Sequence, residues 1–225
     1  MAAACRVDGH GDATLITPGL HRLGLGAGRD GLLWMPPTAE EPPGLLVFFH
    51  GAGADARQSV DLIGTAAADA RMAVLAPDSR GHTWDMRGDG GTDLAFLHSA
   101  LGQVFDRHGV DQARLLLGGF SDGASYALSV GLAQGDVFSG VLAFSPGFAA
   151  PKRRRGNPRI FVAHGRRDNV LPIDRTSRRL VPQLQRQGYV VEYREFPGGH
   201  VVPPEIAREG LGWLICGSTS SPPLS

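Results

Sequence analysis

The sequence predicts an α/β fold with a mostly parallel central sheet, helices on both faces and no large cap domain. Its 225 residues, 42% hydrophobic and 20% charged, suit one globular domain with a sizeable core. Short apolar runs of strand length alternate with segments of helical periodicity, the pattern of parallel strands joined by crossover helices. We expect a single domain over residues 1–216 and a disordered tail over residues 217–225, which is rich in Ser and Pro.

The elements follow from periodicity and turn residues. The predicted strands are Leu20–Leu25, Leu32–Met35, Leu45–Phe49, Met72–Ala76, Arg114–Leu117, Val141–Phe144, Arg159–Ala163 and Tyr189–Phe196. The predicted helices are Val60–Ala70, Asp93–His108, Gly123–Ala133, Asp174–Gln187 and Pro204–Ile215. The first two strands flank Gly28-Arg29-Asp30-Gly31 and should form a hairpin. The stretch between Phe144 and Arg159 is too short for a helical lid.

Charge and composition exclude several classes of protein. The formal net charge is zero, which argues against general affinity for nucleic acid or for anionic membranes. The apolar run Leu45–Phe49 is far too short to cross a bilayer, and the first residues lack the layout of a secretory signal. Cys5 and Cys216 allow one disulfide, but free thiols in a reducing cytoplasm are favoured. We therefore expect a cytoplasmic protein without stable membrane insertion.

A serine lies in the pattern G-x-S-x-G, at Gly119-Phe120-Ser121-Asp122-Gly123, between a predicted strand and a predicted helix. The pattern alone occurs by chance in glycine-rich chains, and the plainer interpretation is an ordinary strand-to-helix turn. In this context, however, a tight turn would lift Ser121 out of the sheet, with glycines on both sides letting the backbones pass. The helix N-terminus would also favour developing negative charge. The context favours Ser121 as a nucleophile.

Two further strand ends carry the partners that such a serine needs. Asp168 follows the strand Arg159–Ala163, and Gly198-Gly199-His200 follows the last strand. Taken alone, Asp168 could cap a helix and His200 could be a surface histidine. Together they complete the order Ser, Asp, His that is typical of the α/β-hydrolase fold. We expect His200 to act as general base and Asp168 to orient it.

The segment His50-Gly51-Ala52-Gly53 follows the strand Leu45–Phe49. Acyl transfer requires donors aimed at the oxyanion of the tetrahedral intermediate, and a glycine-rich loop here can present a backbone N–H. We assign the oxyanion hole to the backbone N–H groups of Ala52 and Asp122, and expect His50 to hold the loop. This mechanism requires no metal and no cofactor.

These motifs resemble those of the phospholipase/carboxylesterase family, which includes the acyl-protein thioesterases, and also those of dienelactone-hydrolase-like esterases. The likeness lies in Gly118–Gly123, His164-Gly165 with Asp168, Val170-Leu171-Pro172, and Gly198–His200. It extends from about Leu45 to Leu214. It implies a compact α/β-hydrolase that acts on carboxylic esters, with thioesters as a further substrate class. Our first hypothesis for the acyl group is a chain of small to medium length.

The chain departs from these families in three places. Family members commonly carry Gln where this chain has Asp122, and we expect this carboxylate to point away from the oxyanion. Dienelactone hydrolases use Cys where this chain has Ser121, so their activity is not implied. The glycine loop reads His-Gly-Ala-Gly-Ala and lacks the usual closing acid.

The substrate pocket is predicted from loops that follow strands. Trp84 and Met86 are candidate walls, and Phe148, Leu171 and Val201 are placed nearby by their positions beside the motifs. The alternative for all five is ordinary packing of loops onto the core. The expected partner is a small-molecule ester, and the sequence does not decide between a monomer and a homodimer.

Two rival functions share this fold. A peptidase or amidase would ordinarily carry a propeller or cap, which this chain lacks. A catalytically silent protein that binds a small ligand would be free to lose the three-residue set, which is intact here.

Overall fold

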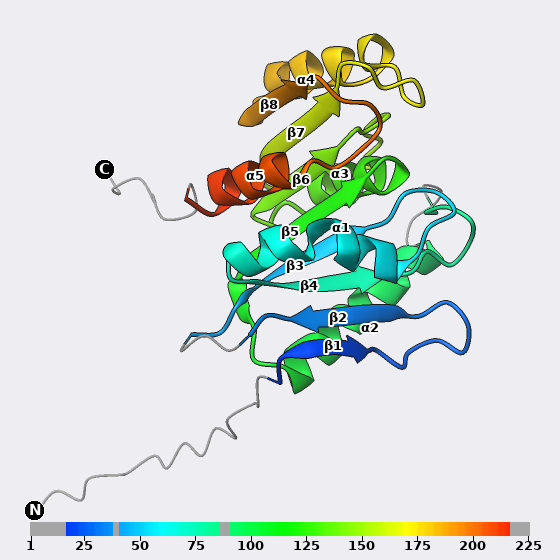
Figure 1. Ribbon diagram of the computed structural model, residues 1–225, viewed down its shortest axis with the longest axis vertical. Helices are drawn as coiled ribbons and strands as arrows, with labels where there is room; N and C mark the ends of the chain where they lie inside the picture. Colours follow the sequence, from blue (N-terminus) through cyan, green and yellow to red (C-terminus); the bar gives the residue numbers. More distant parts are fainter. Residues whose placement is uncertain (1–16, 38–40, 86–90, 217–225) are drawn as a thin grey trace, which may run out of the picture.

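Eight strands form one sheet in the order β1-β2-β4-β3-β5-β6-β7-β8 in the computed structural model (Figure 1). The structure describes residues 17–37, 41–85 and 91–216. The strands are β1 (Gly19–Arg22), β2 (Gly31–Met35), β3 (Gly44–Phe49), β4 (Met72–Pro77), β5 (Asp111–Phe120), β6 (Gly140–Phe144), β7 (Arg159–Gly165) and β8 (Val191–Phe196). The pairs β1–β2 and β2–β4 are antiparallel and the other pairs are parallel. The predicted fold class and the N-terminal hairpin are confirmed.

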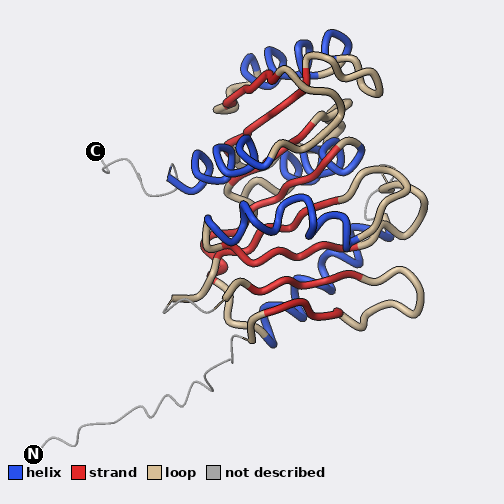
Figure 2. Tube along the Cα trace, in the orientation of Figure 1, coloured by secondary structure: helices blue, strands red, loops and turns tan. Residues whose placement is uncertain are grey.

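Helices cover both faces of the sheet (Figures 1 and 2). They are α1 (Ala56–Asp69), α2 (Thr92–Arg107), α3 (Asp122–Ala133), α4 (Ser177–Arg186) and α5 (Pro204–Cys216). Helices α1 and α5 pack on one face, and α2, α3 and α4 contribute to the core on the other. None of these described helices is long and apolar enough to span a bilayer.

The strand β3 illustrates why the sheet is buried on both sides. Its successive side chains point to opposite faces, so Leu45 and Val47 enter the core beneath α2 and α3 while Leu46 and Phe48 enter the core beneath α1 and α5. All four side chains are fully buried. A continuous apolar run is therefore what this central strand needs.

Most elements differ from their predicted bounds by a few residues, and two of these differences have a clear structural reason. The strand β5 continues through Gly118 and Gly119, which pair with β3 and β6; a Cβ on Gly118 would lie 2.9 Å from the Phe48 ring, so this glycine permits close packing and does not mark a turn. The predicted helix Asp174–Gln187 begins as a 3-10 turn over Ile173–Arg175 and becomes α4 only at Ser177, because the backbone of Thr176 is not helical.

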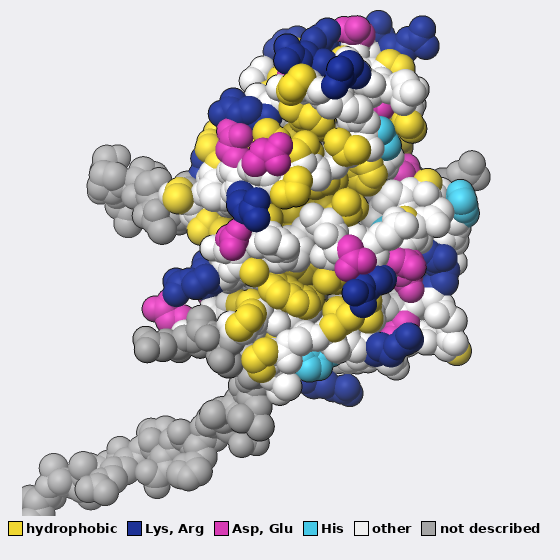
Figure 3. Space-filling view, in the orientation of Figure 1, with side chains coloured by type: hydrophobic (Ala, Val, Ile, Leu, Met, Phe, Trp, Pro, Cys, Tyr) yellow, Lys and Arg dark blue, Asp and Glu magenta, His cyan; other side chains and the backbone are white. Residues whose placement is uncertain are grey.

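The strand β8 lies at one border of the sheet and pairs only with β7 among the described strands. It carries Glu192, Arg194 and Glu195, which form ion pairs on the surface with each other or with α4 and α5. Figure 3 shows acidic and basic side chains interspersed along this edge beside α5.

Three predictions concern residues that the structure does not describe. Cys5, Met86 and the tail 217–225 lie outside the described residues. The pairing state of Cys5, the place of Met86 in a pocket and the disorder of the tail therefore stay predictions, as do the extent of the domain and the cytoplasmic location.

Candidate active site

Ser121 sits at the sharp turn between β5 and α3. Its backbone is left-handed, with φ of +57°, a conformation that costs free energy for a residue other than glycine and recurs at functional sites. The flanking glycines make the turn possible: a Cβ on Gly119 would lie 2.4 Å from the Gly123 carbonyl, and a Cβ on Gly123 would lie 2.2 Å from the Phe49 oxygen. The turn therefore presents the serine side chain at the carboxyl edge of the sheet.

His200, the predicted base, lies within hydrogen-bond distance of both the predicted nucleophile Ser121 and the predicted acid Asp168. The distance from His200 Nε2 to Ser121 Oγ is 2.9 Å, and that from His200 Nδ1 to Asp168 Oδ2 is 2.6 Å. The imidazole also packs on the Phe120 ring, with centroids 4.6 Å apart. With Asp168 ionised, Nδ1–H donates to the carboxylate and Nε2 accepts from the serine hydroxyl, which leaves the imidazole ready to take the serine proton.

The loops that carry Asp168 and His200 are in close contact at Gly165 and Gly199. A Cβ on Gly165 would lie 2.2 Å from the Gly199 oxygen, so only glycine permits this approach. The N–H of Arg166 donates to the Phe196 oxygen at 2.8 Å, and the N–H of Arg167 donates to the Gly198 oxygen at 2.9 Å. The backbone thus holds the two loops at a fixed separation.

Asp168 is almost fully buried, at 6% exposure, yet its carboxylate is well provided with donors. Oδ1 accepts from the N–H groups of Val170 and Leu171 at 3.0 and 2.8 Å. Burial alone would raise the pKa of this carboxyl, but the hydrogen bonds from His200 and Leu171 outweigh burial and hold the pKa below its usual value. Asp168 therefore stays ionised, as a residue that orients an imidazole must.

A second histidine faces the same carboxylate. His164 is fully buried, and its Nε2 lies 2.8 Å from the Leu171 oxygen and 3.2 Å from Asp168 Oδ2. Its Nδ1 lies 2.7 Å from Ser177 Oγ. Burial lowers the pKa of His164, so the ring is neutral, donating from Nε2 and accepting at Nδ1. The sequence prediction quoted His164 only as part of a motif; its position next to the end of β7 was the available signal.

The predicted oxyanion loop lies against Ser121. A Cβ on Gly51 would contact Ser121 Cβ at 3.5 Å, and the backbone N–H groups of Ala52 and Asp122 have no backbone acceptor among the described residues. His50 holds the loop: its Nδ1 lies 2.7 Å from the Gly51 oxygen, and its Nε2 accepts from the Ser79 N–H at 3.0 Å. Burial lowers the pKa of His50 and keeps it neutral.

The Asp122 side chain is held by the loop after β4. Its carboxylate accepts a hydrogen bond from the Trp84 N–H and lies near His50 and His82. Burial raises the pKa of Asp122 and outweighs these contacts, and Oδ2 is buried without a partner in the described structure.

A cleft of about 490 Å³ opens beside Ser121 and His200. Its apolar lining comes from Ala54, Leu62, Phe120 and Val170, and its polar lining from Gln58 and Asp61 of α1 together with Ser121 and His200. The sequence prediction quoted Phe120 and Val170 only as parts of motifs, and it assigned none of the four apolar residues and neither of the two α1 residues to the substrate pocket.

The predicted pocket residues within the described chain do not line this cleft. Trp84 is 3% exposed, packs against the rings of Phe49 and Tyr126, and donates from Nε1 to the His50 oxygen; it belongs to the core. Leu171 is partly buried and serves Asp168 and His164 through its backbone. Phe148 and Val201 are exposed. Their closeness to the motifs in sequence therefore did not translate into a place in the cleft.

The sequence is similar to that of known proteins. The family model of the phospholipases/carboxylesterases matches residues 95–207. The chain is 29% identical over 181 residues to a bifunctional acetylxylan esterase/xylanase of Neocallimastix patriciarum, spanning 76% of this chain and 24% of that protein. It is 29% identical over 130 residues to acyl-protein thioesterase 1 of Gibberella zeae, spanning 53% of this chain and 54% of that protein.

Both alignments thus reach less than two thirds of the relatives' own lengths. Among solved structures, esterase PE8 matches with a TM-score of 0.67 at 23% identity, over 82% of this chain and 97% of that one. This likeness shows the fold.

Proposed function

The chain belongs to the phospholipase/carboxylesterase family, and from this premise we propose that it is a serine esterase whose catalytic residues are Ser121, His200 and Asp168. The family and the relatives, an acetylxylan esterase/xylanase and an acyl-protein thioesterase, support the hydrolysis of ester bonds. The observation that carries the residue assignment is the pair of distances, 2.9 Å from His200 Nε2 to Ser121 Oγ and 2.6 Å from His200 Nδ1 to Asp168 Oδ2.

The reaction runs in two halves. His200 takes the proton of Ser121 as Oγ attacks the ester carbonyl, and the oxyanion is stabilised by the N–H groups of Ala52 and Asp122. The tetrahedral intermediate collapses, His200 gives its proton to the leaving alcohol, and the acyl group remains on Ser121. Water, deprotonated by His200, then attacks the acyl-enzyme; as the bond from the acyl carbon to Oγ breaks, His200 returns this proton to Ser121 Oγ and the acid is released. Asp168 stays ionised throughout and stabilises the imidazolium.

The cleft supports small to medium acyl chains. Its volume of about 490 Å³ falls within the range of pockets that hold small ligands, and its apolar lining suits a hydrocarbon chain. Thioesters of the same acyl groups are included in the proposal, because the attack on the carbonyl and the acyl-enzyme are the same for both leaving groups.

The test is covalent labelling of the whole protein by a fluorophosphonate, with hydrolysis of p-nitrophenyl esters from acetate to octanoate and of matched thioesters. We expect stoichiometric labelling and acyl turnover in the wild type and neither in Ser121→Ala. Ser99→Ala is the control, because Ser99 is an exposed serine on α2. Labelling that persists in Ser121→Ala, or a folded wild type that is neither labelled nor active, would exclude the assignment.

A further inference from the structure

The N-terminal hairpin supplies no residue of the proposed mechanism, yet its turn lies at the sheet edge where the loops of the site meet. Strand β2 begins at Gly31, which pairs with Pro77 at the end of β4. The turn between β1 and β2 therefore reaches the carboxyl ends of the parallel strands (Figure 1). The motif Gly28-Arg29-Asp30-Gly31 predicted a hairpin turn and no further role.

The guanidinium of Arg29 joins two loops of this edge. Its Nη2 donates to the Ala54 oxygen at 3.1 Å and to Ser79 Oγ at 3.3 Å, and its Nε donates to the Ser79 oxygen. Ala54 ends the glycine loop after β3, and Ser79 lies in the loop after β4. Because the guanidinium is planar and its donors have a fixed geometry, it sets the separation of these two loops.

The contacts of Ser79 continue to the first residue of the glycine loop. The N–H of Ser79 donates to His50 Nε2 at 3.0 Å, and Nδ1 of the same ring lies 2.7 Å from the Gly51 oxygen. Burial lowers the pKa of His50, and the charge of Arg29 acts in the same direction, so the ring stays neutral and accepts from Ser79. The loop is therefore held at both of its ends by contacts that begin at Arg29.

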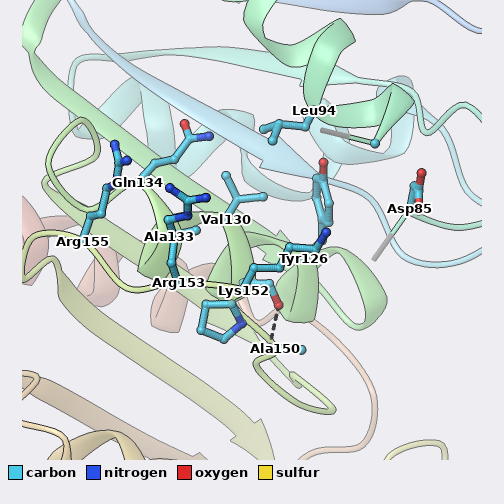
Figure 4. A pocket seen from close by; sticks show the side chains of 13 residues that line it. Asp85, Leu94, Tyr126, Val130, Ala133, Gln134, Ala150, Lys152, Arg153 and Arg155 are labelled. Carbon is cyan, nitrogen blue, oxygen red and sulfur yellow. Dashed lines mark hydrogen bonds between the residues drawn. The ribbon is translucent and has the colours of Figure 1, made fainter. Parts of the chain in front are cut away.

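The core provides a separate attachment for the same loop. Trp84 donates from Nε1 to the His50 oxygen at 2.8 Å and stacks on Tyr126 at a centroid distance of 5.1 Å. Tyr126 comes from α3 and also lines the hollow drawn in Figure 4. This attachment reaches the His50 end of the loop, whereas the side-chain hydrogen bond at the Ala54 end comes from Arg29.

The turn that carries Arg29 is itself anchored. Arg80 donates from Nη1 to the Arg29 oxygen, and the N–H of Asp30 donates to Asp78 Oδ2 at 3.0 Å. The Asp30 carboxylate accepts two further backbone N–H groups of the same turn. The guanidinium is thus presented to the glycine loop by a backbone that is fixed on both sides.

We propose that Arg29 is a positioning residue for the oxyanion hole: it holds the loop after β3 so that the Ala52 N–H is aimed at the developing oxyanion. This inference rests on the proposed esterase function. Stabilisation of an oxyanion requires donors whose direction is fixed before the reaction. The segment 51–54 contains only glycine and alanine and has little side-chain packing of its own to fix that direction.

The kinetic test compares Arg29→Gln and Arg29→Lys in the full chain on p-nitrophenyl butyrate. For Arg29→Gln we expect kcat to fall by about tenfold, less than the loss that removal of an oxyanion donor causes, and KM to change by less than about twofold. Arg29→Lys keeps the charge but loses the fork, so its kcat should lie between those of the wild type and Arg29→Gln.

Arg22→Gln is the matched control. Arg22 is exposed on β1 of the same hairpin, and it donates to neither loop within the described structure. Its replacement should leave kcat and KM unchanged. An unchanged kcat in Arg29→Gln, or an equal loss in Arg22→Gln, would overturn the proposal.

A trifluoromethyl ketone separates positioning from a general loss of structure. Ser121 Oγ adds reversibly to its carbonyl and leaves an oxyanion in the hole, so its dissociation constant should rise about tenfold in Arg29→Gln, as kcat falls. A merely structural role would instead lower the fraction of protein that a fluorophosphonate labels to completion. In that case the dissociation constant of the remaining sites would be unchanged, which would overturn the proposal.

Amide hydrogen exchange tests the attachment without catalysis. The Gly53 N–H donates to the His82 oxygen at 2.8 Å, and we expect it to exchange about tenfold faster in Arg29→Gln and at the wild-type rate in Arg22→Gln. A wild type without labelling or turnover would refute the esterase function itself. An active wild type whose Gly53 exchange is unchanged by Arg29→Gln would refute only the role of Arg29.

Discussion

Asp168 has a donor or an imidazole against each of its two oxygens. Oδ1 accepts two backbone N–H groups, and Oδ2 faces His200 at 2.6 Å and His164 at 3.2 Å. The carboxylate is therefore fixed in orientation before substrate arrives. Preorganisation of this kind is what allows an acid to select one imidazole tautomer without itself taking a proton.

Replacing Asp168 by Asn tests this role. The Asn side chain has the shape of the carboxylate, but it cannot fix the Nδ1–H tautomer of His200. We therefore expect kcat to fall by about 10⁴-fold, while fluorophosphonate labelling slows without disappearing. The measurement is hydrolysis of p-nitrophenyl butyrate. Asp174→Asn is the control, because Asp174 is exposed and pairs only with Arg178 in the described structure; a comparable loss in both variants would contradict the prediction.

The meeting of Ser121, Asp168 and His200 could be predicted from the sequence because each follows a strand and lies close to glycines that a tight loop requires. The residues that line the cleft could not be predicted in this way. Gln58, Asp61 and Leu62 reach it from a face of α1, and how far a helix face projects over the sheet depends on packing that no local pattern records. Trp84 was misassigned for the same reason, because its aromatic partners come from distant parts of the chain.

At the level of elements, the β5–α3 turn depends on two residues without side chains. In Gly123→Ala the new methyl group would lie 2.2 Å from the Phe49 oxygen and 2.4 Å from the His50 oxygen. Both are backbone atoms, and moving them away would cost free energy. We expect a loss of about 3 kcal/mol in the free energy of unfolding, measured by urea denaturation, together with loss of activity.

Gly102→Ala is the contrasting variant. Gly102 lies within α2, and a Cβ there would meet nothing within 4 Å, so alanine should stabilise the helix by about 0.5–1 kcal/mol. Similar stability changes in the two variants would show that close approach at the turn is not what Gly123 provides.

The bounds of the elements were predicted best where periodicity alone decides them, as in α2 and β6. They were predicted less well where glycine serves packing. Gly118 and Gly119 have the composition of a turn, yet they extend β5, because the Phe48 ring of β3 and the backbone of Gly123 leave no room for a Cβ at these positions. A single sequence cannot distinguish a glycine that turns the chain from one that admits a neighbour.

For the molecule as a whole, two buried histidines connect stability to pH. Burial lowers the pKa of His50 and of His164 from 6.5. Below pH 6.5 the unfolded chain therefore binds protons that the folded chain does not, so the free energy of unfolding falls as pH falls from 6.5 toward the lowered values. Each histidine contributes a slope of at most about 1.4 kcal/mol per pH unit.

His164→Gln should make this slope shallower between pH 5 and 6.5, as measured by urea unfolding at intervals of half a unit. Between pH 7 and 8 the two proteins should have the same slope, because the imidazole is neutral in both states there. An unchanged slope at acid pH would mean that His164 is protonated in the folded protein.

The border strand β8 bears on how copies of the protein behave together. Its Glu192, Arg194 and Glu195 keep part of their side chains in water, and a strand from another copy aligned on this border would strip that hydration and disturb the ion pairs. Concentrated solutions should therefore resist the growth of intermolecular sheets from this side, and valine at positions 192 and 194 should remove that protection.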